Sequence, residues 1–146
     1  MITEGVGAGR FSVVHNAAVT PREWNTAVAT GMLRVVVGSA LLRWRRPLAR
    51  SVFGAAPDDK LLPLLFGYFG ARDVAVGVVT LAATRPDGNV AKQVARQGIA
   101  DTADAGLVAA VMARGHISRA RGIPAIAVAV LSAAGEFATA MRLRRA

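Results

Sequence analysis

The stretch Leu61–Thr84, LLPLLFGYFGARDVAVGVVTLAAT, decides the fold class of this chain. It is longer than the roughly 20 apolar residues that an α-helix needs to cross about 30 Å of hydrocarbon. Arg72 and Asp73 lie at its middle. A charged residue at that depth costs about 2.5–3.5 kcal/mol by insertion scales, so it normally faces a partner or a polar cavity. The stretch therefore predicts a transmembrane helix in the interior of a bundle.

Three further segments have the length and composition of membrane helices, at about residues 24–42, 90–113 and 123–143. Trp24 and Trp44 bracket the first of them at about the spacing of two interfacial aromatic belts. The three segments carry charged residues that can pair with the second span, namely Arg34, Asp101, Asp104 and Glu136. The prediction is an all-α fold, a four-helix transmembrane bundle with a charged interior, whose spans lie at about 24–42, 61–84, 90–113 and 123–143.

The chain divides into a short arm and one membrane domain. Residues 1–20 are polar and glycine-rich and predict a flexible N-terminal arm, and residues 21–146 form the four-helix membrane domain. Thr20 followed by Pro21 and, two residues later, by Glu is a typical helix start. Residues 43–60 contain a dense arginine cluster with a few apolar side chains, which predicts a short amphipathic segment in the membrane interface.

The segment at 90–113 is the least hydrophobic of the four. Its polar side chains share one face of the predicted helix: Gln93, Arg96, Gln97, Asp101 and Asp104. Lipid cannot accommodate that stripe, so it must face protein or water. Two interpretations remain, a full span or a half-buried interfacial helix that enters the membrane only from Ala100 onward, and the full span is favoured. Pro124 is expected in the first turn of the last span, where proline is tolerated.

Two features of the second span predict close helix packing. Phe66, Gly70, Asp73, Gly77, Thr80 and Thr84 fall on one arc of the helix. A second face carries a ridge of small residues, Gly67, Ala71 and Ala75, which would let a neighbouring helix approach closely. The turn at residues 85–89 contains proline and glycine and predicts an antiparallel hairpin of the second and third spans.

Composition supports a membrane protein and limits the classes of function. Hydrophobic residues make up 53% of the chain and the mean hydropathy is +0.41. The net charge is +9, but the arginines cluster at the ends of apolar segments, as expected of anchors against anionic headgroups rather than of a nucleic-acid-binding surface. Lysine and arginine residues divide almost evenly between the two predicted sides, so they do not decide the orientation. There is no cysteine, and no metal or cofactor is expected.

Several of these residues are similar to a family of small bacterial membrane proteins. The segments that carry the resemblance are Leu33–Gly38, Pro47, Phe69–Gly77 with its G-A-R-D-x-x-x-G element, and Ala100–Ala105. Members of this family, common in actinobacteria, have four predicted spans and no assigned activity. The first span also resembles the DoxX-like membrane proteins. The resemblance implies a four-helix fold in the bacterial plasma (inner) membrane and implies no reaction.

The predicted site is a buried charged cluster of Arg34, Arg72, Asp73, Asp101, Asp104 and Glu136. Either it holds four helices in register as a scaffold, or it forms a polar cavity that conducts protons or binds a ligand. Catalysis is disfavoured because no nucleophile has a recognisable base partner. The first hypothesis is a non-enzymatic accessory subunit of a larger plasma-membrane assembly, in lipid transport or respiration. The alternative is a small homo-oligomeric transporter or ligand-binding membrane protein that uses this cluster.

Overall fold

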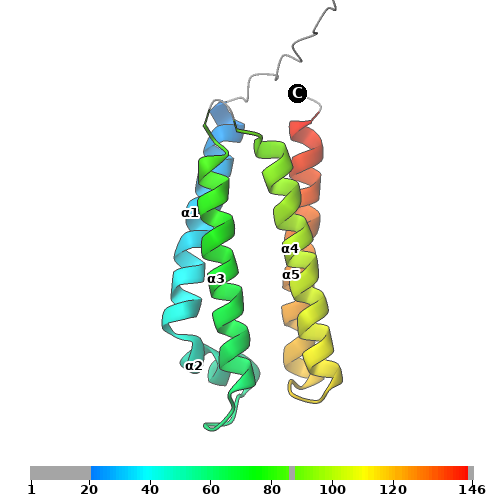
Figure 1. Cartoon of the computed structure of the whole chain (residues 1–146). Helices are drawn as coiled ribbons and strands as arrows, with labels where there is room; N and C mark the ends of the chain where they lie inside the picture. Colours follow the sequence, from blue (N-terminus) through cyan, green and yellow to red (C-terminus); the bar gives the residue numbers. More distant parts are fainter. Residues whose placement is uncertain (1–20, 86–87, 145–146) are drawn as a thin grey trace, which may run out of the picture.

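Every regular element in the described part of the chain, residues 21–85 and 88–144 of the computed structural model, is a helix (Figure 1). The elements are α1 (Pro21–Arg43), α2 (Arg45–Leu48), the π-helical turn η1 (Ala49–Phe53), α3 (Leu61–Ala82), α4 (Val90–Ala113) and α5 (Arg119–Leu143). The predicted all-α class is confirmed, and α1 begins at Pro21 as expected. The arm predicted at residues 1–20, with the Thr20 cap, lies outside the described residues.

The last helix begins four residues earlier than the predicted 123. Gly115, at φ 80°, turns the chain just after α4, and Ser118 has an extended backbone that starts α5. The connection between the two helices is therefore short. Pro124 consequently lies in the second turn of α5 instead of the first. The helix continues through it, although proline lacks the N–H that an interior position would use.

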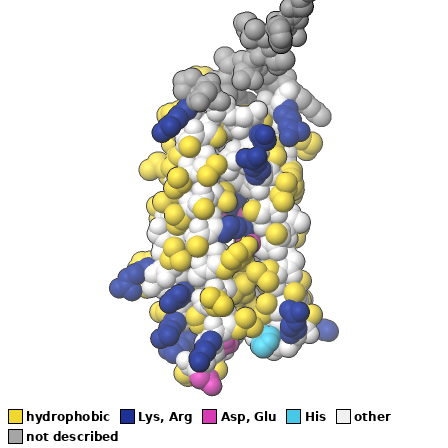
Figure 2. Space-filling model, viewed as in Figure 1, with side chains coloured by type: hydrophobic (Ala, Val, Ile, Leu, Met, Phe, Trp, Pro, Cys, Tyr) yellow, Lys and Arg dark blue, Asp and Glu magenta, His cyan; other side chains and the backbone are white. Residues whose placement is uncertain are grey.

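Three of the long helices have segments that are long and apolar enough to cross a membrane: Trp24–Arg43, Leu61–Ala82 and Arg119–Leu143. α4 has a similar length but does not reach that hydropathy, because its polar stripe interrupts the apolar sequence. Gln93, Gln97 and Asp101 from this stripe are buried in the protein, whereas Arg96 is exposed. Figure 2 shows hydrophobic side chains over much of one face, most Lys and Arg side chains toward its ends, and a small group of charged side chains at its middle.

The four long helices form two antiparallel pairs (Figure 1). α1 packs along α3, and α4 packs along α5, whereas the backbones of α3 and α4 come close to each other at only a few positions. The second and third predicted spans are thus consecutive and antiparallel, but each has its main interface with another helix. We call the boundary between the α1–α3 pair and the α4–α5 pair the seam. The contacts across this seam hold the two pairs together.

Glycines set the close approach of α1 and α3. A Cβ atom on Gly38 would lie 2.6 Å from the carbonyl oxygen of Gly70, and one on Gly77 would lie 2.6 Å from that of Gly31. The two glycines of each helix are seven residues apart and so share one face. Because these four glycines have no side chains, the backbones of α1 and α3 can come into contact.

The small-residue ridge predicted at Gly67, Ala71 and Ala75 does not make this contact. Ala71 and Ala75 are exposed, and a Cβ atom on Gly67 would meet only the Arg45 side chain, at 3.8 Å. The packing face is instead the polar arc, because Gly70, Asp73, Gly77 and Thr80 are buried there. The sequence placed these residues on one arc of the helix, and the structure shows that this arc is the face that packs.

The connection from α1 to α3 is amphipathic, as predicted. Ala49 and Phe53 are buried, and the Phe53 ring lies 5.4 Å from the Phe66 ring, centroid to centroid. The arginines of α2 and η1 are exposed. Gly54, at φ 71°, ends the turn in a left-handed conformation that glycine adopts without strain.

The glycine contact predicts a stability effect. Gly70→Ala should lower the melting temperature of the purified protein in detergent, because the new methyl group would meet the backbone of α1. Gly106→Ala is the matched control: nothing lies within 4 Å of its Cβ position, and alanine favours a helix over glycine by about 0.5–1 kcal/mol. Equal melting temperatures for the two variants would contradict the close packing of α1 on α3.

Candidate functional site

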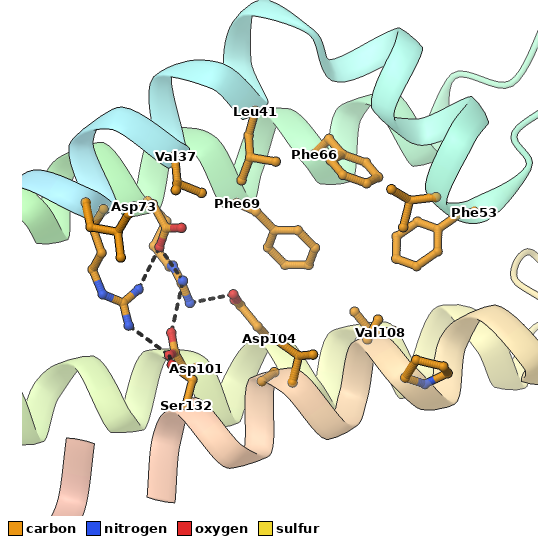
Figure 3. Close-up of a pocket in the computed structure, with 18 of the residues that line it drawn as sticks. Val37, Leu41, Phe53, Phe66, Phe69, Asp73, Asp101, Asp104, Val108 and Ser132 are labelled. Atoms are coloured by element: carbon orange, nitrogen blue, oxygen red, sulfur yellow. Dashed lines mark hydrogen bonds and ion pairs between the residues drawn. The ribbon is translucent and has the colours of Figure 1, made fainter. Parts of the chain in front are cut away.

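The structure brings all six charged residues of the predicted cluster together near the middle of the bundle (Figure 3). All four long helices contribute: Arg34 comes from α1, Arg72 and Asp73 from α3, Asp101 and Asp104 from α4, and Glu136 from α5. Their side chains are only 7% to 14% exposed. Each of the two guanidiniums contacts three carboxylates, and these contacts join all six residues into one network.

Two arginines and two aspartates make up the centre of this network. Asp73 accepts hydrogen bonds from Arg34 Nη1 at 2.8 Å and from Arg72 Nη2 at 2.5 Å. Asp101 accepts from Arg34 Nη2 at 2.8 Å and from Arg72 Nη2 at 3.1 Å. Each aspartate thus bridges both arginines. The structure thus pairs Arg34 with Asp73 and also pairs Arg72 with both aspartates of α4.

We call Arg34, Arg72, Asp73 and Asp101 the central quartet. Its formal charges balance, and Ser132 Oγ adds a hydrogen bond to Asp101 Oδ2 at 2.6 Å. Breaking such a buried set by removing one member is costly, because the remaining charges lose their partners in a medium of low dielectric constant. The arrangement of the quartet is compatible with the scaffold hypothesis, which stays a prediction.

Asp104 and Glu136 lie outside the quartet, and each pairs with a different arginine. Asp104 Oδ2 lies 2.5 Å from Arg72 Nη1, and Glu136 Oε1 accepts a hydrogen bond from Arg34 Nη2. The network therefore contains four carboxylates and two guanidiniums. Asp104 and Glu136 are the surplus acids.

The network also joins the two helix pairs. Arg34 and Arg72 belong to the α1–α3 pair, whereas Asp101, Asp104 and Glu136 belong to the α4–α5 pair. Apolar side chains also meet across the seam, in one cluster that includes Phe66 of α3 and Val108 of α4 and in another that includes Ala27 of α1 and Val94 of α4. Four of the six ion pairs cross the seam, so electrostatic attraction and apolar packing hold the two pairs together.

A first cavity of about 870 Å³ lies on one side of the network, toward α2 and η1. One end of it is charged, because the whole network contributes to its lining. The other walls are mainly apolar, although exposed Arg121 also lines them, and they come from all four long helices and η1. Their apolar residues include Leu41, Phe53, Phe66, Phe69, Val108 and Val128. Figure 3 shows Phe69 and Phe66 of α3 facing Asp104 and Val108 of α4 across this space.

A second cavity of about 660 Å³ lies on the opposite side of the network, toward the ends of α1 and α5 near Thr26 and Arg142. Its lining is more polar and includes Gln97, Thr139 and Arg142. Three residues line both cavities: Thr30, Ser132 and Glu136. Glu136 thus lies at the boundary between the two spaces.

Two buried acceptor oxygens have no hydrogen-bond partner among the described residues: Glu136 Oε2 at the boundary between the cavities and Gln97 Oε1 in the lining of the second cavity. Gln97 is fully buried and donates its Nε2 hydrogen to Thr80 Oγ1. A buried polar atom without a partner is uncommon and marks a place for water or a ligand.

The sequence identified the charged residues but not the two cavities. Phe53 and Phe66 come from separate elements, so no local pattern brings their rings beside the charged network. The sequence identified Gln97 as a member of the polar stripe of α4. It could not show that the Oε1 atom of Gln97 would be buried without a hydrogen-bond partner among the described residues. Over residues 21–85 and 88–144, no group of three or more His, Asp or Glu residues has a geometry that can hold a metal ion.

Comparisons of the chain with protein-family models, with curated proteins and with solved structures gave no match. The resemblance to small four-span bacterial membrane proteins stays a prediction.

The network predicts that Arg34 contributes more to the stability of the protein than an exposed arginine near the same cavity. Arg34→Gln should lower stability by about 3–5 kcal/mol, because three carboxylates lose a partner. Arg121→Gln, at an exposed arginine that lines the same cavity, should change it by about 0.5 kcal/mol or less. Unfolding in detergent micelles measures both effects.

A double-mutant cycle checks the pair directly. Asp73→Asn alone should also destabilise the protein, and adding Arg34→Gln to it should cost less than Arg34→Gln costs in the wild-type chain. Strict additivity of the two changes would show that the two side chains do not interact.

Proposed function

We propose that this protein is a four-span plasma-membrane protein that binds an organic cation with an apolar body in the first cavity. The observation that carries this proposal is the surplus of two carboxylates over the two guanidiniums at the charged end of an apolar cavity. This corresponds to the ligand-binding alternative of the sequence analysis.

Charge selects the sign of the ligand. In a medium of low dielectric constant, a net negative site favours a cation or protons over an anion. The formal charges of the central quartet balance, so the carboxylates of Asp104 and Glu136 supply the net negative charge that would attract a ligand. Asp104 lines only the first cavity, which makes it the acid best placed to face a bound cation.

The shape and lining of the cavity select the rest of the ligand. A volume of about 870 Å³ lies within the range of about 300–1,000 Å³ that is common for small-molecule sites. Phe53, Phe66 and Phe69 offer apolar contact area, and aromatic faces also attract cations. A charged group beside Asp104 and an apolar body among the three rings would use both ends of the cavity.

The access route supports a ligand that dissolves in the membrane. Leu33 and Val37 of α1 and Val128 of α5 line the cavity and are also exposed on the outer surface. These two helices have no substantial contact with each other. A lipophilic cation could therefore enter from the apolar surroundings of the helices.

The four-span topology rests on α4. It lies along α5 with a similar length, and its buried polar residues face the protein instead of lipid. A helix that buries its polar stripe in this way can cross the membrane beside its partner.

The accessory-subunit hypothesis stays a prediction. The exposed apolar faces of α1 and α5 suit lipid and a partner helix equally well. Extraction in mild detergent followed by native mass measurement separates a heteromeric complex from a homo-oligomer or a single chain.

The topology can be tested with single cysteines in this cysteine-free chain. The α2–η1 segment and the α4–α5 connection lie at one end of the bundle and the α3–α4 connection at the other (Figure 1). Arg50→Cys and His116→Cys should therefore react with an impermeant thiol reagent from one side of the membrane, and Arg85→Cys from the other. Labelling of positions 85 and 116 from the same side would show that α4 does not cross.

The binding proposal can be tested with two probes of matched shape and opposite charge. Tetraphenylphosphonium should bind the purified protein in titration calorimetry, and tetraphenylborate should not. Asp104→Asn should weaken tetraphenylphosphonium binding by about tenfold, or about 1.4 kcal/mol, because it removes one surplus charge.

Asp58→Asn removes an exposed carboxylate outside both cavities and serves as the control, with binding unchanged. Binding of tetraphenylborate in preference to tetraphenylphosphonium would overturn the assignment of charge. A failure of the protein to bind either probe would remove the proposal.

A further inference from the structure

Glu136 differs from the other acids of the network in its position. It is the one carboxylate, among the described residues, that lines both cavities. Its Oε1 atom accepts from Arg34, whereas Oε2 is buried without a hydrogen-bond partner in the described part of the chain. One oxygen thus belongs to the network, and the other accepts no hydrogen bond from the described residues.

Arg34 does not depend on Glu136 for its charge balance. Asp73 and Asp101 also pair with Arg34, each at 2.8 Å. The other charged groups around Glu136 are Arg72 and Asp73 from α3 and Asp101 and Asp104 from α4, while Arg142 on its own helix lines the second cavity. Because the quartet is balanced, Glu136 can take up a proton without leaving an arginine unpaired.

The second cavity has the chemistry of a water-filled space. Thr30, Gln97, Ser132 and Thr139 line it, and Gln97 Oε1 is a fully buried acceptor without a partner among the described residues. Ordered water needs about two to four polar partners and room for its volume, and this cavity offers both. Arg142, which is exposed, lies among its lining residues and connects the space to the end of the bundle.

From these observations we infer that Glu136 is a proton-exchange group served by the second cavity, so that an organic cation bound in the first cavity displaces one proton from it. The inference rests on the proposed function and adds a coupling to it. The Glu136 carboxylic acid loses its proton to water in the second cavity and becomes a carboxylate. One positive charge enters the interior as one leaves, so the net charge of the interior is unchanged.

The test uses the purified full-length chain in weakly buffered detergent solution with a pH indicator dye. Tetraphenylphosphonium should release about one proton for each cation bound, and its affinity should rise about tenfold per pH unit in the range where the proton is displaced. Glu136→Gln carries a permanently neutral side chain, so its binding should release no proton and should not depend on pH. Glu136→Asp restores a titratable group and should restore the release.

A variant in the second cavity tests the path without altering the network. Gly135 lines that cavity, and a Cβ atom placed there meets nothing within 4 Å, so the side chain of Gly135→Leu can occupy the space. Stopped-flow mixing with tetraphenylphosphonium should show that Gly135→Leu releases its proton several-fold more slowly than the wild-type protein. The affinity of this variant for tetraphenylphosphonium at fixed pH should be unchanged. Gly106→Leu, at an exposed glycine of α4 that lines neither cavity, should release protons at the wild-type rate.

The outcomes separate the two proposals. Absence of tetraphenylphosphonium binding at every pH would remove the proposed function and this inference with it. Binding without proton release, or with equal release from Glu136→Gln, would overturn the inference and leave the cation site intact. If Glu136→Gln fails to fold, two other measurements decide: the number of protons that the wild-type protein releases and the rate of proton release in Gly135→Leu. Proton release from Gly135→Leu at the wild-type rate would overturn the path through the second cavity.

Discussion

The bundle depends on buried charges that must stay paired. In a medium of low dielectric constant, an isolated guanidinium or carboxylate is far more costly than in water, so each arginine of the network must keep carboxylate partners. Arg34 and Arg72 lie on one helix pair and most of their partners on the other. Two hydrophobic clusters also join the pairs, so the ion pairs and this apolar packing together fix how the pairs face each other.

Packing within the pairs follows a different principle. α1 and α3 meet where glycines remove side chains, so dispersion forces between the two backbones act at short range. This contact holds α1 and α3 closely together. Side chains of the two pairs pack against each other in two hydrophobic clusters, and the two cavities lie where these clusters and the charged network leave space.

The division of the network into a balanced quartet and two surplus acids reconciles the scaffold with the ligand-binding hypothesis. Asp73 and Asp101 each contact both arginines, and this arrangement suits a structural role. Asp104 and Glu136 each contact one arginine and face cavities. In our proposal the same arginines thus hold the helices and orient two acids for cation and proton binding. One ionic cluster can both hold the helices and bind a ligand, because two of its acids contact both arginines and the other two contact only one.

The sequence by itself determined the helical class, the positions of the long helices to within a few residues, and the six charged residues of the interior. These follow from local rules, since an apolar stretch long enough to span a membrane must satisfy its backbone as a helix and its charges must avoid lipid. Only the tertiary structure decided that α1 packs on α3 through Gly31, Gly38, Gly70 and Gly77 instead of the Gly67 ridge. It also decided which acids are surplus and where the cavities lie, because those features arise from contacts between residues far apart in the chain, and helical periodicity carries no information about which helix a given face will meet.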